Sequence, residues 1–267
     1  MVAIARRAIG TRRVGHAGTL DPFATGLLIV LAGAGTRLAR YLVGLPKVYE
    51  GMLRLGTTTA TDDATGAVLS TSDACDALAD AEIAAAMTAL TGEREQLPPV
   101  FSAKHSGGER AHRLARRGEP VALVPQRVIV RSFALAARTG RDVRFRADVG
   151  SGTYVRSLAR ELGEALGCGA HLAELRRLAV GGFTVGEAVS LEAVRAGTPR
   201  LRPLLAAVGH LPRTEIDAAA VDRVRRGQAL EAAFPAAGPV ALIHDGELVA
   251  VARTQDGRWQ PEVVLVP

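Results

Sequence analysis

The chain has 267 residues, of which 48% are hydrophobic, 22% charged and 4% aromatic. This balance is typical of a globular protein and excludes a disordered or collagen-like chain. The net charge is +6, and 31 of the 33 basic residues are arginine, which favours a polyanionic partner, although an arginine-rich proteome would give the same bias.

Cysteine usage and hydropathy bound the class of protein further. Cys75 and Cys168 are too few for a disulfide framework, and the six histidines show no metal-ligand spacing. No apolar run approaches the roughly 18 residues of a membrane span. The first residues carry arginines but no apolar core of a signal peptide. We therefore expect a soluble protein of the reducing cytoplasm.

Helical and alternating patterns follow one another along the first half of the chain. Helical spacing over residues 2–9 stops at Gly10, a typical helix end. The polar segments 15–26 and 56–66 predict loops. The pattern predicts further helices over 36–42 and 76–90, an apolar strand over 27–31 and an alternating strand over 47–55.

The second half of the chain predicts more strands and ends in a small β-rich part. Prolines keep residues 96–104 extended, and residues 199–212 are a candidate linker. Helices are expected over 109–117, 153–166, 191–196 and 218–226. Strands are expected over 121–124, 128–136, 143–149, near Phe183, and over 239–243, 248–252 and 263–266.

The loop GHAGTLDPFATG, residues 15–26, concentrates an imidazole, a carboxylate and three glycines. Glycine lets a backbone bend tightly and approach a ligand, and Pro22 fixes the turn directly after Asp21. Such a loop presents the Asp21 carboxylate from a rigid base. The alternative is an Asx turn, in which that carboxylate accepts hydrogen bonds from backbone amides. His16 alone is more typical of an ordinary loop histidine than of a catalyst.

Other reaction classes lack their motifs in this chain. There is no phosphate-binding glycine loop, no metal-ligand spacing and no serine or cysteine nucleophile motif. The remaining candidate for the chemistry is the carboxylate of Asp21, in a chain that is basic overall. A carboxylate can add covalently to an electrophilic carbon, and aspartate nucleophiles are common in glycosidic chemistry.

Four blocks in series carry a resemblance to one family. GHAGTLDPFATGLL resembles the central motif of the TruB family of bacterial tRNA pseudouridine synthases. Similar blocks follow in the family's order: KVY leading to LGTTTATDDATG, then QLPPVFSAKHSGGERAHRLARRG, then GTYVR leading to LARELGEALGCGAHLAELRRLAVGGF. Together they cover most of residues 1–205, which makes the resemblance specific.

The resemblance implies that the chain converts uridine 55 in the TΨC arm of tRNA to pseudouridine on a flipped-out base. Asp21 matches the nucleophile of the family, and the sequence leaves open whether it attacks the ribose or the uracil ring. The reaction is a redox-neutral rearrangement, so no metal or organic cofactor is implied. The expected partner is tRNA, with no membrane and no obligate protein partner.

The same resemblance implies roles for five more residues. Tyr49 matches the aromatic residue that stacks on the flipped base and helps proton removal. Arg156 matches the arginine that pairs with the catalytic carboxylate, keeping it ionised and oriented. Residues that match the base-binding set are His16, Tyr154 and Leu175, of which His16 enters the space that the flipped nucleotide leaves.

Each role has a plain alternative. Tyr49 on an alternating strand could be core, Arg156 could bind a phosphate or a surface acid, and Leu175 could simply pack. The arginines of residues 109–117 and the pair Arg176 and Arg177 fit phosphate contacts, or a solvated surface. As a whole, the chain could be a noncatalytic tRNA-binding or RNA-folding protein of the same family, or another glycosyl-transfer enzyme acting on a nucleoside.

The expected fold class is α+β: a mixed, largely antiparallel central sheet with flanking helices, plus a small β-rich C-terminal domain. We expect a catalytic domain over residues 1–205 and a domain related to the PUA RNA-binding module over residues 211–267. Family members usually begin with an apolar strand and a Lys-Pro motif. We expect a shortened amino terminus, because residues 1–14 contain neither.

Overall fold

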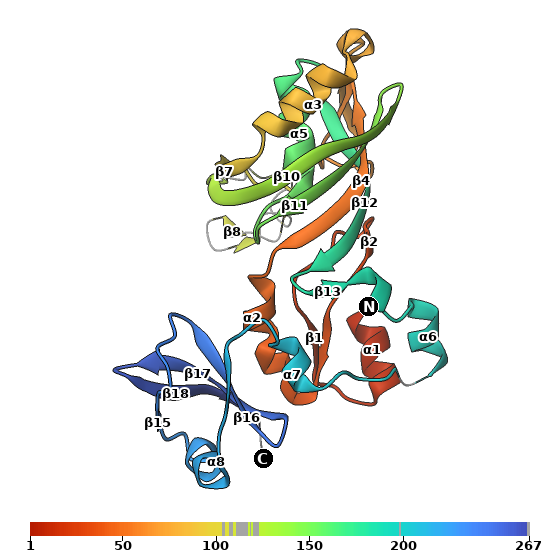
Figure 1. Ribbon diagram of the computed structural model, residues 1–267. Coiled ribbons are helices and arrows are strands. Elements are labelled where there is room, and N and C mark those ends of the chain that lie inside the picture. The colour runs from red at the N-terminus through yellow and green to blue at the C-terminus, as the bar shows by residue number, and fades with distance from the viewer. Residues whose placement is uncertain are drawn as a thin grey trace. The chain divides into compact units, whose positions relative to one another are not determined.

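The structure is a computed structural model, and it describes residues 1–102, 105–106, 109–110, 117, 119, 123–197 and 199–265 (Figure 1). Contacts divide the chain into two compact units, each described by itself. The site unit comprises Leu20–Leu27 and Gly44–Gly186, and the terminal unit comprises Met1–Thr19, Leu28–Val43 and Glu187–Pro267. This division differs from the predicted domain boundary between residues 205 and 211, which stays a prediction.

The site unit is built on a seven-stranded sheet with the order β13-β12-β4-β11-β10-β7, in which β2 also pairs with β12. All the pairs are antiparallel except β2 with β12, so the expected mixed, largely antiparallel sheet is confirmed. The strands are β2 (Thr25–Gly26), β4 (Lys47–Leu55), β7 (Gly92–Gln96), β10 (Gln126–Thr139), β11 (Asp142–Val149), β12 (Ala170–Val180) and β13 (Phe183–Thr184).

Two helices, α3 (Asp80–Ala89) and α5 (Val155–Ala165), pack on one face of this sheet (Figure 1). Strand β4 alternates, so Leu53 and Leu55 point into the core below the helices and are fully buried. Leu158 and Leu162 of α5, one helical turn apart, are also fully buried. The apolar alternation of the strands and the apolar stripe of α5 together form the main core.

The opposite face of the sheet carries charged side chains in cross-strand pairs. Exposed pairs of this kind contribute about 1 kcal/mol or less each, so they mark a solvated surface more than a source of stability. The pairs are Arg54–Asp142 at 2.8 Å, Arg131–Asp148 at 3.2 Å, Arg144–Glu174 at 3.6 Å and Arg176–Glu50 at 3.7 Å.

The terminal unit combines short N-terminal elements with a five-stranded sheet of order β14-β16-β17-β18-β15. Leu38 and Val208 pack with the apolar residues of this sheet in one core cluster. Its elements are α1 (Val2–Ile9), β1 (Val14–His16), β3 (Val30–Ala32), η1 (Gly33–Leu38), α2 (Ala39–Val43), α6 (Leu191–Ala196), α7 (Leu204–Ala207), β14 (Arg213–Glu215), α8 (Ala218–Arg225), β15 (Leu230–Glu231), β16 (Pro239–His244), β17 (Glu247–Gln255) and β18 (Arg258–Val264).

Short elements complete the chain. They are β5 (Thr57–Thr59), β6 (Val68–Thr71), η2 (Ala74–Ala77), β8 (His105–Ser106), β9 (Glu109–Arg110) and η3 (Val185–Glu187). Strand β5 lies inside the predicted loop 56–66, and α7 lies inside the predicted linker. In the part of the chain that the structure describes, no helix is long and apolar enough to cross a membrane.

Several predicted elements are confirmed with their bounds, among them α1, β4 and α6. The helix expected over 109–117 is wrong at its start, because Glu109–Arg110 form a strand; residues 111–116 lie outside the described residues. Of the strand expected over 121–124, residues 121–122 also lie outside them. Strands β7 and β12 were not predicted, although β12 lies inside the sheet.

We expect Gly163→Ala to destabilise the protein. Alanine favours a helix interior by about 1 kcal/mol over glycine. However, a Cβ at Gly163 would lie 2.1 Å from the Ala170 nitrogen, where α5 packs on the start of β12. Because that contact is backbone, we expect a net loss of roughly 1–3 kcal/mol in the free energy of unfolding, measured with urea.

Gly182→Ala is the matched control, because a Cβ there would meet no atom within 4 Å. We expect its stability to stay within about 0.5 kcal/mol of the unmodified protein. Equal stability of the two variants would contradict this account of the packing between α5 and β12.

Candidate active site

The loop that carries Asp21 is anchored at both ends within the site unit. Leu20 and Phe23 pack against the main core, and the Leu27 nitrogen donates to the Arg177 carbonyl at 2.8 Å. The turn after Asp21 is closed through its main chain, since the Ala24 nitrogen donates to the Asp21 carbonyl at 3.0 Å. The Asp21 carboxylate is therefore left available for other partners.

Arg156, in the first turn of α5, is the partner of that carboxylate. Its Nε donates to Asp21 Oδ2 at 3.2 Å and its Nη2 donates to Asp21 Oδ1 at 3.1 Å, which is a bidentate pair. Among the described residues, only Arg156 donates to the Asp21 carboxylate, so the Asx-turn interpretation is not supported. The Asp21 side chain stays 29% exposed, whereas Arg156 is 6% exposed.

The guanidinium of Arg156 is fixed by three acceptors on two other segments. Nη1 donates to the Thr61 carbonyl and Nη2 donates to the Phe101 carbonyl, each at 3.0 Å. The Nη1 atom also lies 3.5 Å from Asp63 Oδ2. A guanidinium held on so many sides has one orientation, and it fixes the orientation of the Asp21 carboxylate in turn.

Asp63 is a member of this site to which sequence reasoning gave no role. It is 4% exposed, and its Oδ1 accepts from Thr61 Oγ1 at 2.7 Å and from the Thr65 nitrogen at 2.9 Å. The segment TDDATG resembles the family only as a block, and the resemblance assigns no role to Asp63. The sequence does contain a signal for Asp63: it is a second carboxylate next to threonine residues, whose hydroxyl groups can hold a buried acid in place.

Tyr49 lies on β4 with its side chain in the core. It is 9% exposed and pairs with Ala147 on one side and Arg177 on the other. Burial raises the pKa of the Tyr49 hydroxyl, while the charge of Arg177 and a hydrogen bond from it lower that pKa and Asp21 raises it. The pKa of Tyr49 is thus affected both by Asp21, the candidate nucleophile, and by Arg177, a buried cation.

Tyr154 and Leu175 flank the same region of the site unit. Tyr154 is the N-cap residue of α5, and its nitrogen donates to Gln96 Oε1 at 2.8 Å. Burial raises the pKa of the Tyr154 hydroxyl, and a hydrogen bond with Ser102 lowers it. Leu175, 6% exposed, lines a pocket of about 420 Å³ that Phe23 also lines.

His16, Arg176 and Arg177, which the sequence assigned to RNA contacts, lie in different surroundings. His16 is exposed on β1 of the terminal unit, where it pairs with Val30. The predicted phosphate contact at Arg177 is wrong, because Arg177 is 1% exposed and its Nε donates to the Leu27 carbonyl at 2.8 Å. Arg176 is exposed and lies 3.7 Å from Glu50.

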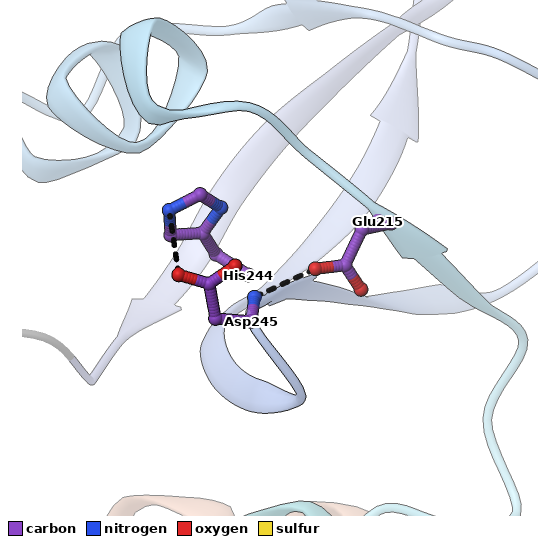
Figure 2. Close-up of side chains that lie close together, drawn as sticks. All are labelled: Glu215, His244 and Asp245. Carbon is purple, nitrogen blue, oxygen red and sulfur yellow. Dashed lines mark hydrogen bonds and ion pairs between the residues drawn. The ribbon is translucent and has the colours of Figure 1, made fainter.

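Among the residues that the structure describes, one group of side chains could hold a metal ion, and it lies in the terminal unit. Ligand atoms of Glu215, His244 and Asp245 lie within 4.8 Å of one another (Figure 2). However, the Asp245 nitrogen donates to Glu215 Oε1 at 2.7 Å, and His244 Nδ1 lies 2.7 Å from the Ile216 carbonyl. These contacts account for the group as a support of the turn between β16 and β17.

Comparison with known families covers nearly the whole chain. Residues 6–155 match the N-terminal domain of the TruB family of pseudouridylate synthases. Residues 156–205 match the C-terminal domain of tRNA pseudouridylate synthase B, and residues 211–266 match the C-terminal part of tRNA pseudouridine synthase II.

Individual relatives and solved structures give the same picture. The chain is 43% identical to tRNA pseudouridine synthase B of Thermobifida fusca, over 99% of this chain and 92% of the relative. It is 42% identical to the enzyme of that name from Aromatoleum aromaticum, over 92% and 81%. A Cbf5-Nop10-Gar1 complex contains a similar chain, with a TM-score of 0.72 and 26% identity over 100% of this chain and 80% of that one. An archaeal box H/ACA Nop10-Cbf5 complex contains another, with a TM-score of 0.70 and 26% identity over 100% and 81%.

Lys47, buried beside Arg177, gives a pH-dependent prediction. Burial, and then the charge of Arg177, lower the pKa of Lys47 to about 8, against 10.5 for the ordinary side chain. Below pH 8 the folded protein carries the full cost of the buried charge. Between pH 8 and 10.5 the unfolded chain binds the extra proton, so the folded state gains stability as pH rises.

We therefore expect the stability of the unmodified protein, relative to Lys47→Met, to rise by about 1–3 kcal/mol across this range. Urea unfolding of both proteins at several pH values measures it. Other titrating groups are common to both proteins and cancel in the difference. A stability difference that does not change with pH would contradict the depressed pKa.

Proposed function

Because this chain belongs to the TruB family of pseudouridine synthases, we propose that it isomerises uridine 55 in the TΨC loop of tRNA to pseudouridine, with Asp21 as the nucleophile. The family membership supports an isomerase, and the names of the relatives support tRNA as its substrate. The bidentate pair between Asp21 and Arg156 carries the assignment of the nucleophile.

The reaction needs a carboxylate that is oriented and still reachable. The C1′–N1 bond of the uridine breaks, the base turns, a C1′–C5 bond forms, C5 loses its proton and N1 gains one. A carboxylate that adds to a carbon of the nucleoside, either on the ribose or on the uracil, divides this change into easier steps. Arg156 orients the Asp21 carboxylate from one side. The Asp21 side chain is 29% exposed, which leaves another side for the substrate.

Tyr49, Tyr154 and Leu175 supply the surface that a flipped base needs. Unstacking a base costs a few kcal/mol, and stacking on aromatic and apolar side chains returns it. Tyr49 takes a second role, as the group that receives the proton from C5. Tyr49 is 9% exposed, and the charge of Asp21 is among the causes that raise the pKa of its hydroxyl.

The terminal unit would hold the tRNA. Its first thirteen residues include four exposed arginines, which suit contacts with phosphates. These are Arg6, Arg7, Arg12 and Arg13. His16 would enter the space that the flipped nucleotide leaves, and residues 211–267 would add a further RNA contact as a PUA-like domain. The redox-neutral rearrangement implies no metal or organic cofactor, because a carboxylate and a proton carrier can complete it.

We expect Asp21→Asn to abolish pseudouridine formation on a tRNA transcript, because an amide cannot serve as the nucleophile. Binding of tRNA should stay within about tenfold, roughly 1.4 kcal/mol. Product is measured by chemical detection of pseudouridine, and binding by filter retention. Asp142→Asn is the matched control, since Asp142 forms a bidentate pair with Arg54 on the exposed face of the sheet.

Normal turnover by Asp21→Asn would show that another group is the nucleophile. A complete absence of product from the unmodified protein, with tRNA still bound, would favour the alternative of a noncatalytic RNA-binding member of the family.

Binding should weaken steeply with salt, because contacts with phosphates release counterions. The slope of log affinity against log salt is about −0.7 to −0.9 for each phosphate contact. Replacing Arg12 and Arg13 together with alanine should make this slope shallower by about one to two. A salt response that is flat, or that is unchanged in the double variant, would contradict phosphate contacts at these arginines.

A further inference from the structure

Helix α5 carries a second arginine, Arg160, one turn after Arg156. Residues four positions apart lie on the same face of a helix. The Arg160 Nη1 atom donates to Asp62 Oδ2 at 2.5 Å, and its Nη2 atom donates to the Leu97 carbonyl at 2.8 Å. Its Nε atom lies 3.7 Å from Glu164 Oε1 on the same helix. Arg160 therefore joins α5 to two other segments of the chain.

The segment that contains Asp62 is the one that orients Arg156. The carbonyl of Thr61, before Asp62, accepts from Arg156 Nη1 at 3.0 Å. The carboxylate of Asp63, after Asp62, lies 3.5 Å from the same nitrogen. Asp62 has a φ of 59°, a left-handed conformation that aspartate tolerates better than most residues. Two consecutive carboxylates thus bind arginines on successive turns of α5, with Asp62 on Arg160.

Both arginines also bind the segment that follows β7. The Leu97 carbonyl accepts from Arg160, and the Phe101 carbonyl accepts from Arg156 Nη2 at 3.0 Å. Each arginine therefore binds both segments that pack on α5. Because the acceptors lie on shared segments, a shift of either segment at Arg160 also displaces the acceptors of Arg156.

The pair of Arg160 and Asp62 is more enclosed than the pairs on the outer face of the sheet. The Arg160 side chain is 22% exposed and the Asp62 side chain is 17% exposed, whereas Arg54 is 50% exposed. Partly buried charges are screened less by salt than exposed ones. Two cations one helical turn apart repel each other, and the two aspartates compensate this repulsion. The pair therefore belongs to the same electrostatic arrangement as Arg156.

We propose that Arg160 and Asp62 form a positioning pair for the isomerisation: they hold the acceptors of Arg156, which in turn orients the Asp21 carboxylate. The proposal rests on the role proposed above for Asp21. Within the described residues, the hydrogen bonds of Arg160 go to Asp62 and Leu97 and not to Asp21, so the pair acts through Arg156. A carboxylate that attacks a carbon has to be held within a narrow range of geometry. Loss of the pair should therefore slow the reaction without weakening the binding of tRNA.

The first test measures the hold on Arg156 without any turnover. The Arg156 Nε donates to Asp21 Oδ2, and a hydrogen-bonded proton exchanges slowly with water. In protein with ¹⁵N-labelled arginine, its signal is identified by NMR as the one that Arg156→Lys removes. Arg160→Met should speed the exchange of this proton by about tenfold or more. Unchanged exchange would overturn the proposal.

The second test separates the rate from the binding. In single-turnover assays with saturating tRNA, Asp62→Asn and Arg160→Met should each slow pseudouridine formation roughly 5- to 50-fold. The Kd for tRNA should change less than about threefold, since the loss falls on the reaction step. Asparagine keeps the size of the side chain and tolerates the left-handed backbone, so it removes only the charge. An unchanged rate, or a loss confined to Kd, would overturn the proposal.

Arg138→Met is the matched control for Arg160→Met. Arg138 also joins separate segments of the site unit: its guanidinium donates to the Leu78 and Cys75 carbonyls and lies 3.2 Å from Asp80. Its side chain is 12% exposed, so its loss should lower the stability to urea about as much as the loss of Arg160. The proton exchange and the rate should both stay unchanged. A similar loss of rate in this control would assign the effect to stability alone and overturn the proposal.

A second variant keeps the tests interpretable. Arg160→Lys replaces Arg160→Met if thermal unfolding shows that the latter does not fold. Lysine keeps the charge but lacks the planar fork that reaches Asp62 and Leu97 together, so faster exchange and a slower rate are still expected. If the unmodified protein forms no pseudouridine, the proposed function fails, whereas the proton exchange still decides whether Arg160 positions Arg156.

Discussion

The site depends on one guanidinium that is buried between two carboxylates. Arg156 binds Asp21 on one side and lies 3.5 Å from Asp63 Oδ2 on the other, and two backbone carbonyls accept its remaining donors. A buried charge without such partners would be strongly destabilising. Helix α5, the segment that contains Phe101 and the segment around Asp63 therefore have to be in place before Asp21 can be oriented.

The sequence predicted the local parts of this protein best. Strand β4 alternates strictly and α1 ends at Gly10, whose φ is 71°, so both could be located from periodicity and a helix stop. Strand β12 was missed, because its charged residues interrupt the apolar pattern. Arg177 shows this most clearly, because an arginine is expected at the surface, whereas Arg177 pairs with Tyr49 across the sheet and is buried.

The site was predictable only where a family pattern named the residues. Asp21 and Arg156 are 135 positions apart, and no local pattern joins them; the fold brings them to 3.1 Å. Asp63 belongs to the same arrangement but had no role in the quoted motif. The cross-strand pairing of Arg177 with Tyr49 needs the register of β4 and β12, which depends on strand pairing across more than a hundred residues.

The paired charges on the outer face of the sheet have a consequence for substrate capture. Four of the arginines there each lie within 4 Å of a carboxylate on another strand, so these charges cancel at short range. These four pairs add no net charge and therefore contribute little long-range potential. The net charge of +6 arises from other residues, among them the exposed Arg146 on β11.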